Sequence, residues 1–210
     1  FALYRYLTAH GIKCRVIAPS TIKEERSKRR VKTDRLDALK LAQSLAFDQC
    51  KFVAVPTTEI EAIRDYIRMR DDLKAELKRI KQHIKAFYLR HNKQFDKKES
   101  WNIQHLAWLK KLTFTEPLLR ETLDEYLTHY NDLIDKIATL DKRILEIAER
   151  PEYKKNVKNL SCIKGVTPLS ALAYISEIGD FNRFASASQF ASFLGLTPGE
   201  YSSGEKGQKL

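Results

Sequence analysis

A regular alternation of apolar residues over positions 119–147 constrains the fold of this chain more than any other feature. Apolar and tyrosine side chains recur there at steps of four and three without interruption. The members of this seam are Leu119, Leu123, Tyr126, Tyr130, Leu133, Ile137, Leu140, Ile144 and Ile147. Such spacing places one stripe along a single helix and is typical of a coiled coil of about four heptads.

A second segment, residues 57–95, has a helical pattern and carries many charges. Its apolar side chains also repeat at steps of four and three, at Leu73, Leu77, Ile80, Ile84 and Phe87. The two segments flank a less regular stretch, residues 96–117. We therefore predict a helical hairpin, in which the seam is used either within the chain or for dimerisation. An ordinary helical bundle without a partner is the alternative.

The first 56 residues follow a different pattern, in which helices and short strands alternate. This order is typical of an α/β domain, so we expect residues 1–56 to be the tail of such a domain. The expected elements are a helix over 1–10, a strand over 13–18, a helix over 34–47 and a strand over 51–55.

After Pro151 the pattern indicates a compact helical module, with further helices over 169–178 and around 187–194. Glycines at 179 and 195 provide the expected stops. We therefore expect three domains. Residues 1–56 would be the end of the α/β domain, residues 57–150 a coiled-coil helical domain, and residues 151–210 the first part of a small all-α domain.

Composition favours a polyanionic partner. The 210 residues carry a formal net charge of +11, and nucleic acid is the usual polyanionic partner of a chain with such an excess of positive charge. A soluble protein that is basic for another reason is the alternative. The three cysteines are widely spaced and odd in number, which argues against a disulfide framework or a zinc site and fits a reducing cytoplasm. No apolar run approaches the ~20 residues of a membrane span.

Two acids, Asp34 and Asp37, are three residues apart at the start of a predicted helix. Their carboxylates would share one helix face and offer Mg²⁺ the hard oxygen ligands that it prefers. Acids in a first helical turn also stabilise the helix dipole, which is the simpler explanation. A dense basic run precedes the pair and could hold phosphates beside it, or could be a solvated loop. Its cations are Lys23, Arg26, Lys28, Arg29, Arg30 and Lys32.

Two further segments could bind or cut a nucleic-acid backbone. Residues 163–168, Ile-Lys-Gly-Val-Thr-Pro, resemble the turn of a helix-hairpin-helix unit, where Lys164, Gly165 and Thr167 would face a phosphate. A second glycine is usual where Thr167 stands, and a simple turn between helices is the alternative. The loop around Ser203 and Gly204 could present a hydroxyl nucleophile, with Lys206 as a nearby cation and Tyr201 as a rival nucleophile.

Taken together, four stretches resemble one known family. They are residues 32–38, 163–167, 190–198 and 203–204, and they occur in the expected order. They resemble the insertion-sequence transposases with a DEDD-type RuvC-like N-terminal domain and a C-terminal transposase domain that bears a serine. The Piv-type DNA invertases and the bridge-RNA-guided recombinases belong to this family. The resemblance implies a DNA transposase or site-specific recombinase that acts in the bacterial cytoplasm, on the nucleoid.

The resemblance also implies a fold and a set of site residues. The fold would be mostly α: an incomplete RuvC/RNase H-like α/β fragment, then the coiled-coil region, then a helix-hairpin-helix-like domain. Asp34 and Asp37 would be the last two DEDD acids and would bind Mg²⁺, and Ser203 would be the nucleophile. DNA, an element-encoded guide RNA and further copies of the chain would be the partners, giving a homodimer or tetramer through the coiled coil.

The first two acids of the DEDD set are not among these residues, so we expect the 210-residue chain by itself to be inactive and the intact protein to be an enzyme. Two other functions stay open. A RuvC-like endonuclease would hydrolyse branched DNA with carboxylates and water alone. A non-catalytic DNA-binding coiled-coil remnant would depend on neither the acids nor the serine.

Overall fold

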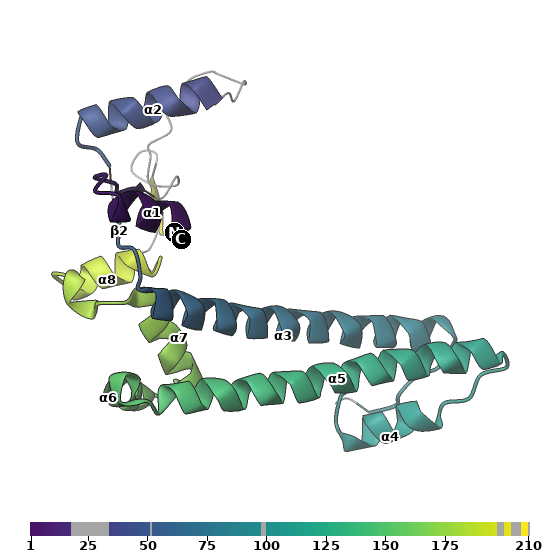
Figure 1. Cartoon of the computed structure of the whole chain (residues 1–210). Coiled ribbons are helices and arrows are strands. Elements are labelled where there is room, and N and C mark those ends of the chain that lie inside the picture. Colours follow the sequence, from purple (N-terminus) through teal and green to yellow (C-terminus); the bar gives the residue numbers. More distant parts are fainter. Residues whose placement is uncertain (18–33, 51, 98–99, 197–199, 203–206, 210) are drawn as a thin grey trace. The chain divides into compact units, whose positions relative to one another are not determined.

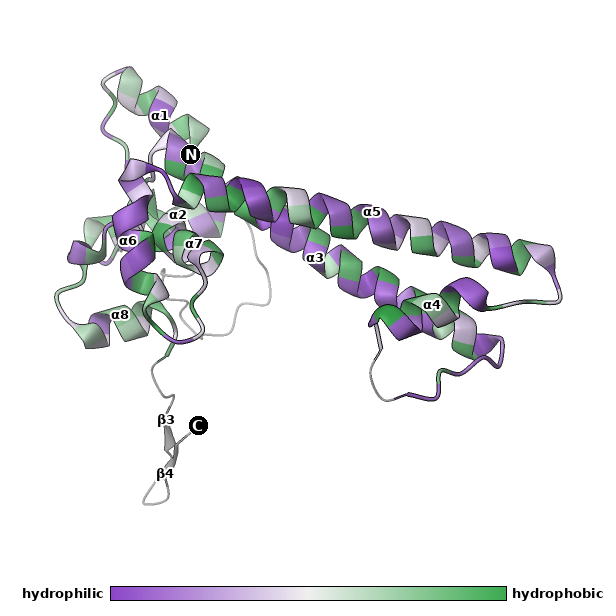
Figure 2. Ribbon diagram, turned by 90° about the horizontal axis from the view of Figure 1, so that it is seen from below, coloured by the Kyte–Doolittle hydropathy of each residue, from purple (hydrophilic) through white to green (hydrophobic). Residues whose placement is uncertain are grey.

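The computed structural model describes residues 1–17, 34–50, 52–97 and 100–196, together with the backbone of 200–202 and 207–209. The chain forms two compact units, Phe1–Thr58 and Glu59–Leu210. Most of the described residues are helical, as expected, and the hydrophobic and hydrophilic residues of the long helices alternate along their length (Figure 2). No helix in the described ranges is long and apolar enough to cross a membrane.

The N-terminal unit contains two helices and one small antiparallel sheet. Its elements are α1 (Ala2–Ala9), β1 (Val16–Ile17), α2 (Asp34–Ala46) and β2 (Phe52–Val53). Strands β1 and β2 pair with Val16 opposite Val53. The Arg5 guanidinium donates to the Pro56 carbonyl oxygen at 3.1 Å, which ties α1 to the segment after β2. The predicted order of helix, strand, helix and strand is confirmed, but two strands of two residues do not define a RuvC-like fold, which stays a prediction.

Two long helices dominate the second unit. Helix α3 (Thr58–Arg90) and helix α5 (Pro117–Ala148) lie side by side as an antiparallel hairpin (Figure 1). Most of the seam residues on α5 are buried within this hairpin, and Leu123 and Ile144 have no exposed surface. The seam is therefore used within the chain, because the apolar stripe of α3 lies against it.

The stretch between the long helices, predicted as irregular, contains a helix. Helix α4 (Ile103–Lys111) begins after Asn102, whose side chain accepts a hydrogen bond from the His105 backbone N–H at 2.8 Å. It packs against the far end of the hairpin and closes a cluster that we call the tip core. The tip core consists of Ile80, Ile84, Phe87, Tyr88, Leu109, Leu112, Leu123, Leu127, Tyr130 and Leu133. The prediction missed α4 because a helix of nine residues is too short to show a clear apolar periodicity.

His105 lies fully buried among aromatic rings beside the tip core. Its Nδ1 accepts a hydrogen bond from the Trp101 backbone N–H at 3.1 Å, so the neutral ring carries its proton on Nε2. Nε2 is buried and has no hydrogen-bond partner among the described residues. Burial, and secondarily the charge of Lys85, lowers the pKa of His105.

We expect the protein to lose stability as the pH falls below about 6.5 because of His105. The unfolded chain binds the proton at the ordinary histidine pKa of ~6.5, whereas the folded chain binds it only at a lower pH. The stabilising effect is therefore complete above about pH 6.5 and declines toward the lowered pKa, by at most about 1.4 kcal/mol per pH unit. Urea denaturation of wild type and His105→Gln at pH 7.5 and pH 5 measures this effect. The difference in stability between the two proteins should narrow at pH 5, and a constant difference would contradict the assignment.

The other end of the hairpin packs against two shorter helices, α6 (Pro151–Ser161) and α7 (Pro168–Ile178). Together they form a second cluster, the base core. Its buried members are Ile63, Ile67, Ile144, Ile147, Ala148, Tyr153, Val157, Ala171, Leu172 and Ile175. In addition, the Arg64 guanidinium donates to the carbonyl oxygens of Ser176 and Glu177 at the end of α7. The C-terminal module is thus joined to the hairpin by a common core.

The rest of the chain contains a 3₁₀ turn, η2 (Phe181–Arg183), and helix α8 (Ala187–Phe193). Strand β3 (Glu200–Ser202) then pairs with β4 (Gly207–Lys209) in antiparallel order. The expectation of an all-α C-terminal domain is therefore wrong for its last residues. The sequence there has Gly and Ser between two short polar segments, a pattern that suits a β-hairpin as well as a linker.

Candidate functional site

The structure places Asp34 and Asp37 together in the first turn of α2. Asp34 is exposed and Asp37 is half-buried, and their separation of three residues puts both carboxylates on one helix face. Asp37 also lies 3.8 Å from the Lys40 ammonium group, a largely exposed ion pair that contributes little to stability. Both carboxylates therefore stay accessible to solvent and to a ligand.

Two carboxylates suit a divalent cation, because Mg²⁺ prefers oxygen ligands and keeps several waters. The described residues contain no group of three or more potential metal-ligating side chains. Asp34 and Asp37 therefore fit as two ligands of a Mg²⁺ ion, and the other ligands would have to come from waters, from substrate or from residues beyond the described ranges. The predicted basic run, with Lys23, Arg26, Lys28, Arg29, Arg30 and Lys32, lies outside the described residues.

The predicted phosphate-binding turn lies between α6 and α7. Gly165 has a φ of +90°, which a residue with a side chain rarely adopts, and a Cβ atom there would meet nothing within 4 Å. The glycine is therefore needed for its backbone conformation and not for space. Val166 donates its backbone N–H to the Ile163 carbonyl oxygen at 3.0 Å and closes the turn.

Thr167 stands where a second glycine was expected, and the structure gives it a specific role. Its hydroxyl accepts a hydrogen bond from the Ser170 backbone N–H at 3.2 Å, so Thr167 is the N-cap of α7. Pro168 takes the first helical position, where no N–H is needed. Lys164 is exposed beside this helix start. The arrangement brings one cation and one helix N-terminus together, as phosphate binding requires.

The predicted nucleophile Ser203 and the cation Lys206 lie outside the described residues. Their flanking strands are described as backbone: Ser202 pairs with Gly207, and Tyr201 pairs with Gln208. The hairpin belongs to the second compact unit, and the acids of α2 belong to the first.

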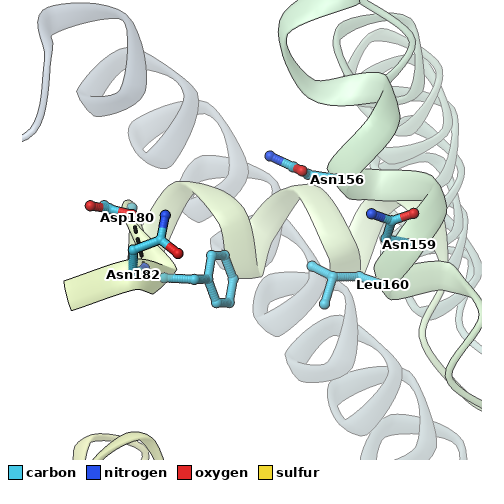
Figure 3. A pocket seen from close by; sticks show the side chains of 7 residues that line it. Asn156, Asn159, Leu160, Asp180 and Asn182 are labelled. Atoms are coloured by element: carbon cyan, nitrogen blue, oxygen red, sulfur yellow. Dashed lines mark hydrogen bonds between the residues drawn. The ribbon is translucent and has the colours of Figure 1, made fainter. Parts of the chain in front are cut away.

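A polar pocket, which was not predicted from the sequence, lies between α6 and the turn after α7. Asn156 and Asn159 line it from α6, and Asp180 and Asn182 from the other side (Figure 3). Two asparagines three residues apart on an amphipathic helix were the available signal. Their partners across the pocket depend on how α7 packs, which no local pattern gives.

A basic, mainly helical chain with an accessible acidic pair and a capped helix start is suited to binding and processing nucleic acid. Comparison with known proteins makes this specific. Residues 1–92 match the family model of the IS110 DEDD transposases, which is described as a transposase. Residues 157–210 match the transposase IS116/IS110/IS902 family. The chain belongs to the IS110/IS116 family of transposases.

Individual relatives agree with this assignment. The chain is 35% identical over 187 residues to the transposase for insertion sequence element IS1533 of Leptospira borgpetersenii, covering 86% of the chain and 53% of the relative. It is 33% identical over 210 residues to a putative transposase of Sinorhizobium fredii, covering all of the chain and 50% of the relative. It is 23% identical over 205 residues to the transposase for insertion sequence element IS1111A of Coxiella burnetii, covering 97% of the chain and 55% of the relative. The chain thus spans about half the length of these relatives.

Proposed function

We propose that the protein containing this chain is a DNA transposase that cuts and rejoins DNA with a Mg²⁺-binding acidic site and a serine nucleophile, and that a guide RNA selects its target. The observation that carries this proposal is the pair of family matches, one over a range that includes Asp34 and Asp37 and one over a range that includes Ser203. The net charge of +11 supports DNA and RNA as partners.

Asp34 and Asp37 would hold Mg²⁺ on their common face of α2. The ion would lower the energy of the negative charge that develops on a phosphate during strand transfer. The two carboxylates bind and orient, and they take no part in covalent chemistry. The basic residues that precede them along the chain, Arg29, Arg30 and Lys32 among them, would hold the flanking phosphates by charge.

Ser203 would supply the nucleophile. Its Oγ attacks a backbone phosphorus atom, a bond from phosphorus to serine oxygen forms, and one bridging phosphorus–oxygen bond of the DNA breaks. The displaced DNA oxygen leaves as a hydroxyl and takes up a proton equivalent to the one that Oγ loses. Attack by another DNA hydroxyl on the phosphoserine ester reverses these changes and rejoins the strands without an external energy source.

The turn at Lys164, Gly165 and Thr167 would bind a DNA or RNA phosphate away from the reacting one. Protomers would associate through the hairpin into a homodimer or tetramer, which would allow the acids of one protomer to act with Ser203 of another. Because the seam is buried within one chain, association would use the outward faces of α3 and α5, where Met69, Ile134 and Leu145 are exposed.

Formation of a covalent adduct tests the proposal. The full-length protein, with Mg²⁺ and the RNA of its element, is incubated with DNA that carries the element ends, and adducts are separated under denaturing conditions. We expect wild type, Ser202→Ala and Tyr201→Phe to form the adduct. Ser203→Ala and Asp34→Ala should reduce it at least about a thousandfold, as is usual when a nucleophile or a metal ligand is removed.

Other outcomes point to different functions. Cleavage without an adduct, unaffected by Ser203→Ala, indicates an endonuclease that uses the carboxylates and water. Binding without cleavage, unaffected by every variant, indicates a DNA-binding remnant. Loss of the adduct only in Tyr201→Phe moves the nucleophile to the tyrosine.

A further inference from the structure

The pocket between α6 and the end of α7 has the size of a small-molecule site. Its volume is about 480 Å³, within the range of ~300–1,000 Å³ that is typical of such sites. Asn156 and Asn159 extend toward it from α6, opposite Asp180 and Asn182 (Figure 3). Four short polar side chains from two segments of the chain thus line one pocket.

These side chains have hydrogen-bonding capacity that the protein does not use. Within the described part of the chain, the carboxamides of Asn156, Asn159 and Asn182 make no hydrogen bond. The Asp180 carboxylate accepts one, from the Asn182 backbone N–H to Oδ1 at 2.9 Å, and this bond fixes its position at the start of η2. Each carboxamide offers two donors and one acceptor oxygen, and the carboxylate adds acceptors. The pocket therefore presents both hydrogen-bond donors and hydrogen-bond acceptors to a ligand.

The apolar part of the pocket comes from Phe181 and Leu160. The Phe181 side chain is partly exposed, at 36%, although a phenyl ring is usually buried. An aromatic face beside carboxamide groups is the combination with which proteins hold unstacked bases, since the ring stacks and the amides read the base edge.

The charge of the pocket argues against a phosphate as the occupant. Asp180 would repel a phosphate, and none of the described residues that line the pocket has a cationic side chain. A single carboxylate is also a poor site for a divalent cation, which is usually bound by more than one charged ligand. A neutral planar ligand with both donors and acceptors satisfies the side chains that are present.

We propose that this pocket binds one unpaired nucleobase of a single-stranded or looped nucleic acid, with preference for a base that carries an amino group next to a ring N–H, as guanine does. Asp180 accepts from these two donors, the asparagines bond the remaining edge, and Phe181 stacks on the ring. The inference rests on the proposed function, in which the protein binds DNA and a guide RNA. It identifies the residues that would recognise one base of that nucleic acid.

The residue after Asn182 is suited to hold the adjoining backbone. The Arg183 guanidinium carbon lies 4.7 Å and 4.6 Å from the ring centroids of Phe184 and Phe193. Stacking between two rings fixes the guanidinium plane and leaves its N–H edge for a phosphate oxygen. A base in the pocket and its phosphate on Arg183 would together fix one nucleotide.

Fluorescence anisotropy on the 210-residue chain tests the proposal. The probes are a short oligouridylate and a short oligothymidylate, each with and without one central guanine nucleotide, and a duplex DNA of equal length. Wild type should prefer the probes with guanine. Asn156→Ala/Asn159→Ala and Phe181→Ala should each weaken binding of these probes about tenfold, the effect of losing one base contact. Their affinity for the duplex and the salt dependence of binding should stay unchanged.

The exposed Asn131→Ala on α5 is the matched control and should bind every probe as wild type does. Circular dichroism melting verifies that the pocket variants fold, which their exposed positions favour.

Equal losses of affinity for single strands and for duplex would overturn the proposal in favour of a phosphate site. No loss of affinity for any probe would overturn it outright. Tighter binding of the RNA probe than of the DNA probe, or the reverse, shows which nucleic acid supplies the base. Both results support the proposal that the pocket binds a base. A wild-type chain that binds no probe removes the proposed function together with this inference, whereas binding that ignores the pocket variants removes only the inference.

Discussion

Replacing Ile144 by alanine should destabilise the second unit by about 2–5 kcal/mol, the usual cost of removing a fully buried isoleucine from a core. Ile144 has no exposed surface and belongs to the base core, which α3, α5, α6 and α7 build together. The side chains around it are held by four helices and have little room to close the cavity. Urea denaturation followed by circular dichroism gives the free energy of unfolding before and after the change.

The neighbouring residue provides the control. Leu145 lies on the same turn of α5 but is 43% exposed, so Leu145→Ala should change stability by no more than about 0.5 kcal/mol. Because the base core joins the hairpin to the C-terminal module, Ile144→Ala should shift one cooperative transition of the whole unit. Two separate transitions, of which Ile144→Ala moves only one, would show that hairpin and module unfold independently.

The second large effect concerns the ion pair between α3 and α5. The buried Arg70 side chain donates from Nε to Asp141 Oδ1 at 2.6 Å and from Nη2 to Oδ2 at 3.2 Å. A third bond, from Nη1 to Asp71 Oδ1, measures 2.9 Å. The bonds to Asp141, more than those to Asp71, raise the pKa of Arg70 against the opposing effect of burial. The guanidinium is therefore charged and depends chiefly on Asp141.

We expect Asp141→Ala to destabilise the protein by about 2–4 kcal/mol, because it leaves a buried cation with one partner. Asp71→Ala is the matched control: Asp71 bonds the same guanidinium but its side chain is 60% exposed, so its loss should cost no more than about 1 kcal/mol. The double variant Arg70→Met/Asp141→Leu should be more stable than Asp141→Ala alone, because no charge is left buried. Equal effects of Asp141→Ala and Asp71→Ala in urea denaturation would refute the burial argument.

The helices of this protein were largely predictable, since they depend on local periodicity. Helix α2 begins at Asp34, α5 contains the whole seam, and α7 ends before Gly179 with its φ of +73°, all as the pattern predicted. Helix α4 was missed because its capping by Asn102 and its contacts with the tip core determine it more than its own short pattern. The β3–β4 hairpin was missed because its polar sequence also suits a linker.

The structure describes two parts of the predicted site, and both depend on the local geometry of the backbone. The common face of Asp34 and Asp37 follows from a spacing of three residues, and the turn at Gly165 follows from a glycine before a proline-started helix. Ser203 and the basic run lie outside the described residues, so their roles stay predictions. The pocket at Asn156 and Asn182 could not be predicted, because its two walls are 26 residues apart and meet only through the packing of α6 on α7.

The sequence by itself determined most of the helical segments, the excess of positive charge and the residues that place the chain in its family, because each of these depends on residue type and short-range spacing. The tertiary structure decided which surface the seam contacts. A heptad stripe fits any complementary stripe equally well, and only the antiparallel packing of α3 on α5 assigns it to the interior of one chain. It also decided the shared base core and the polar pocket, because both arise from side chains that are distant in sequence and adjacent only after the helices pack.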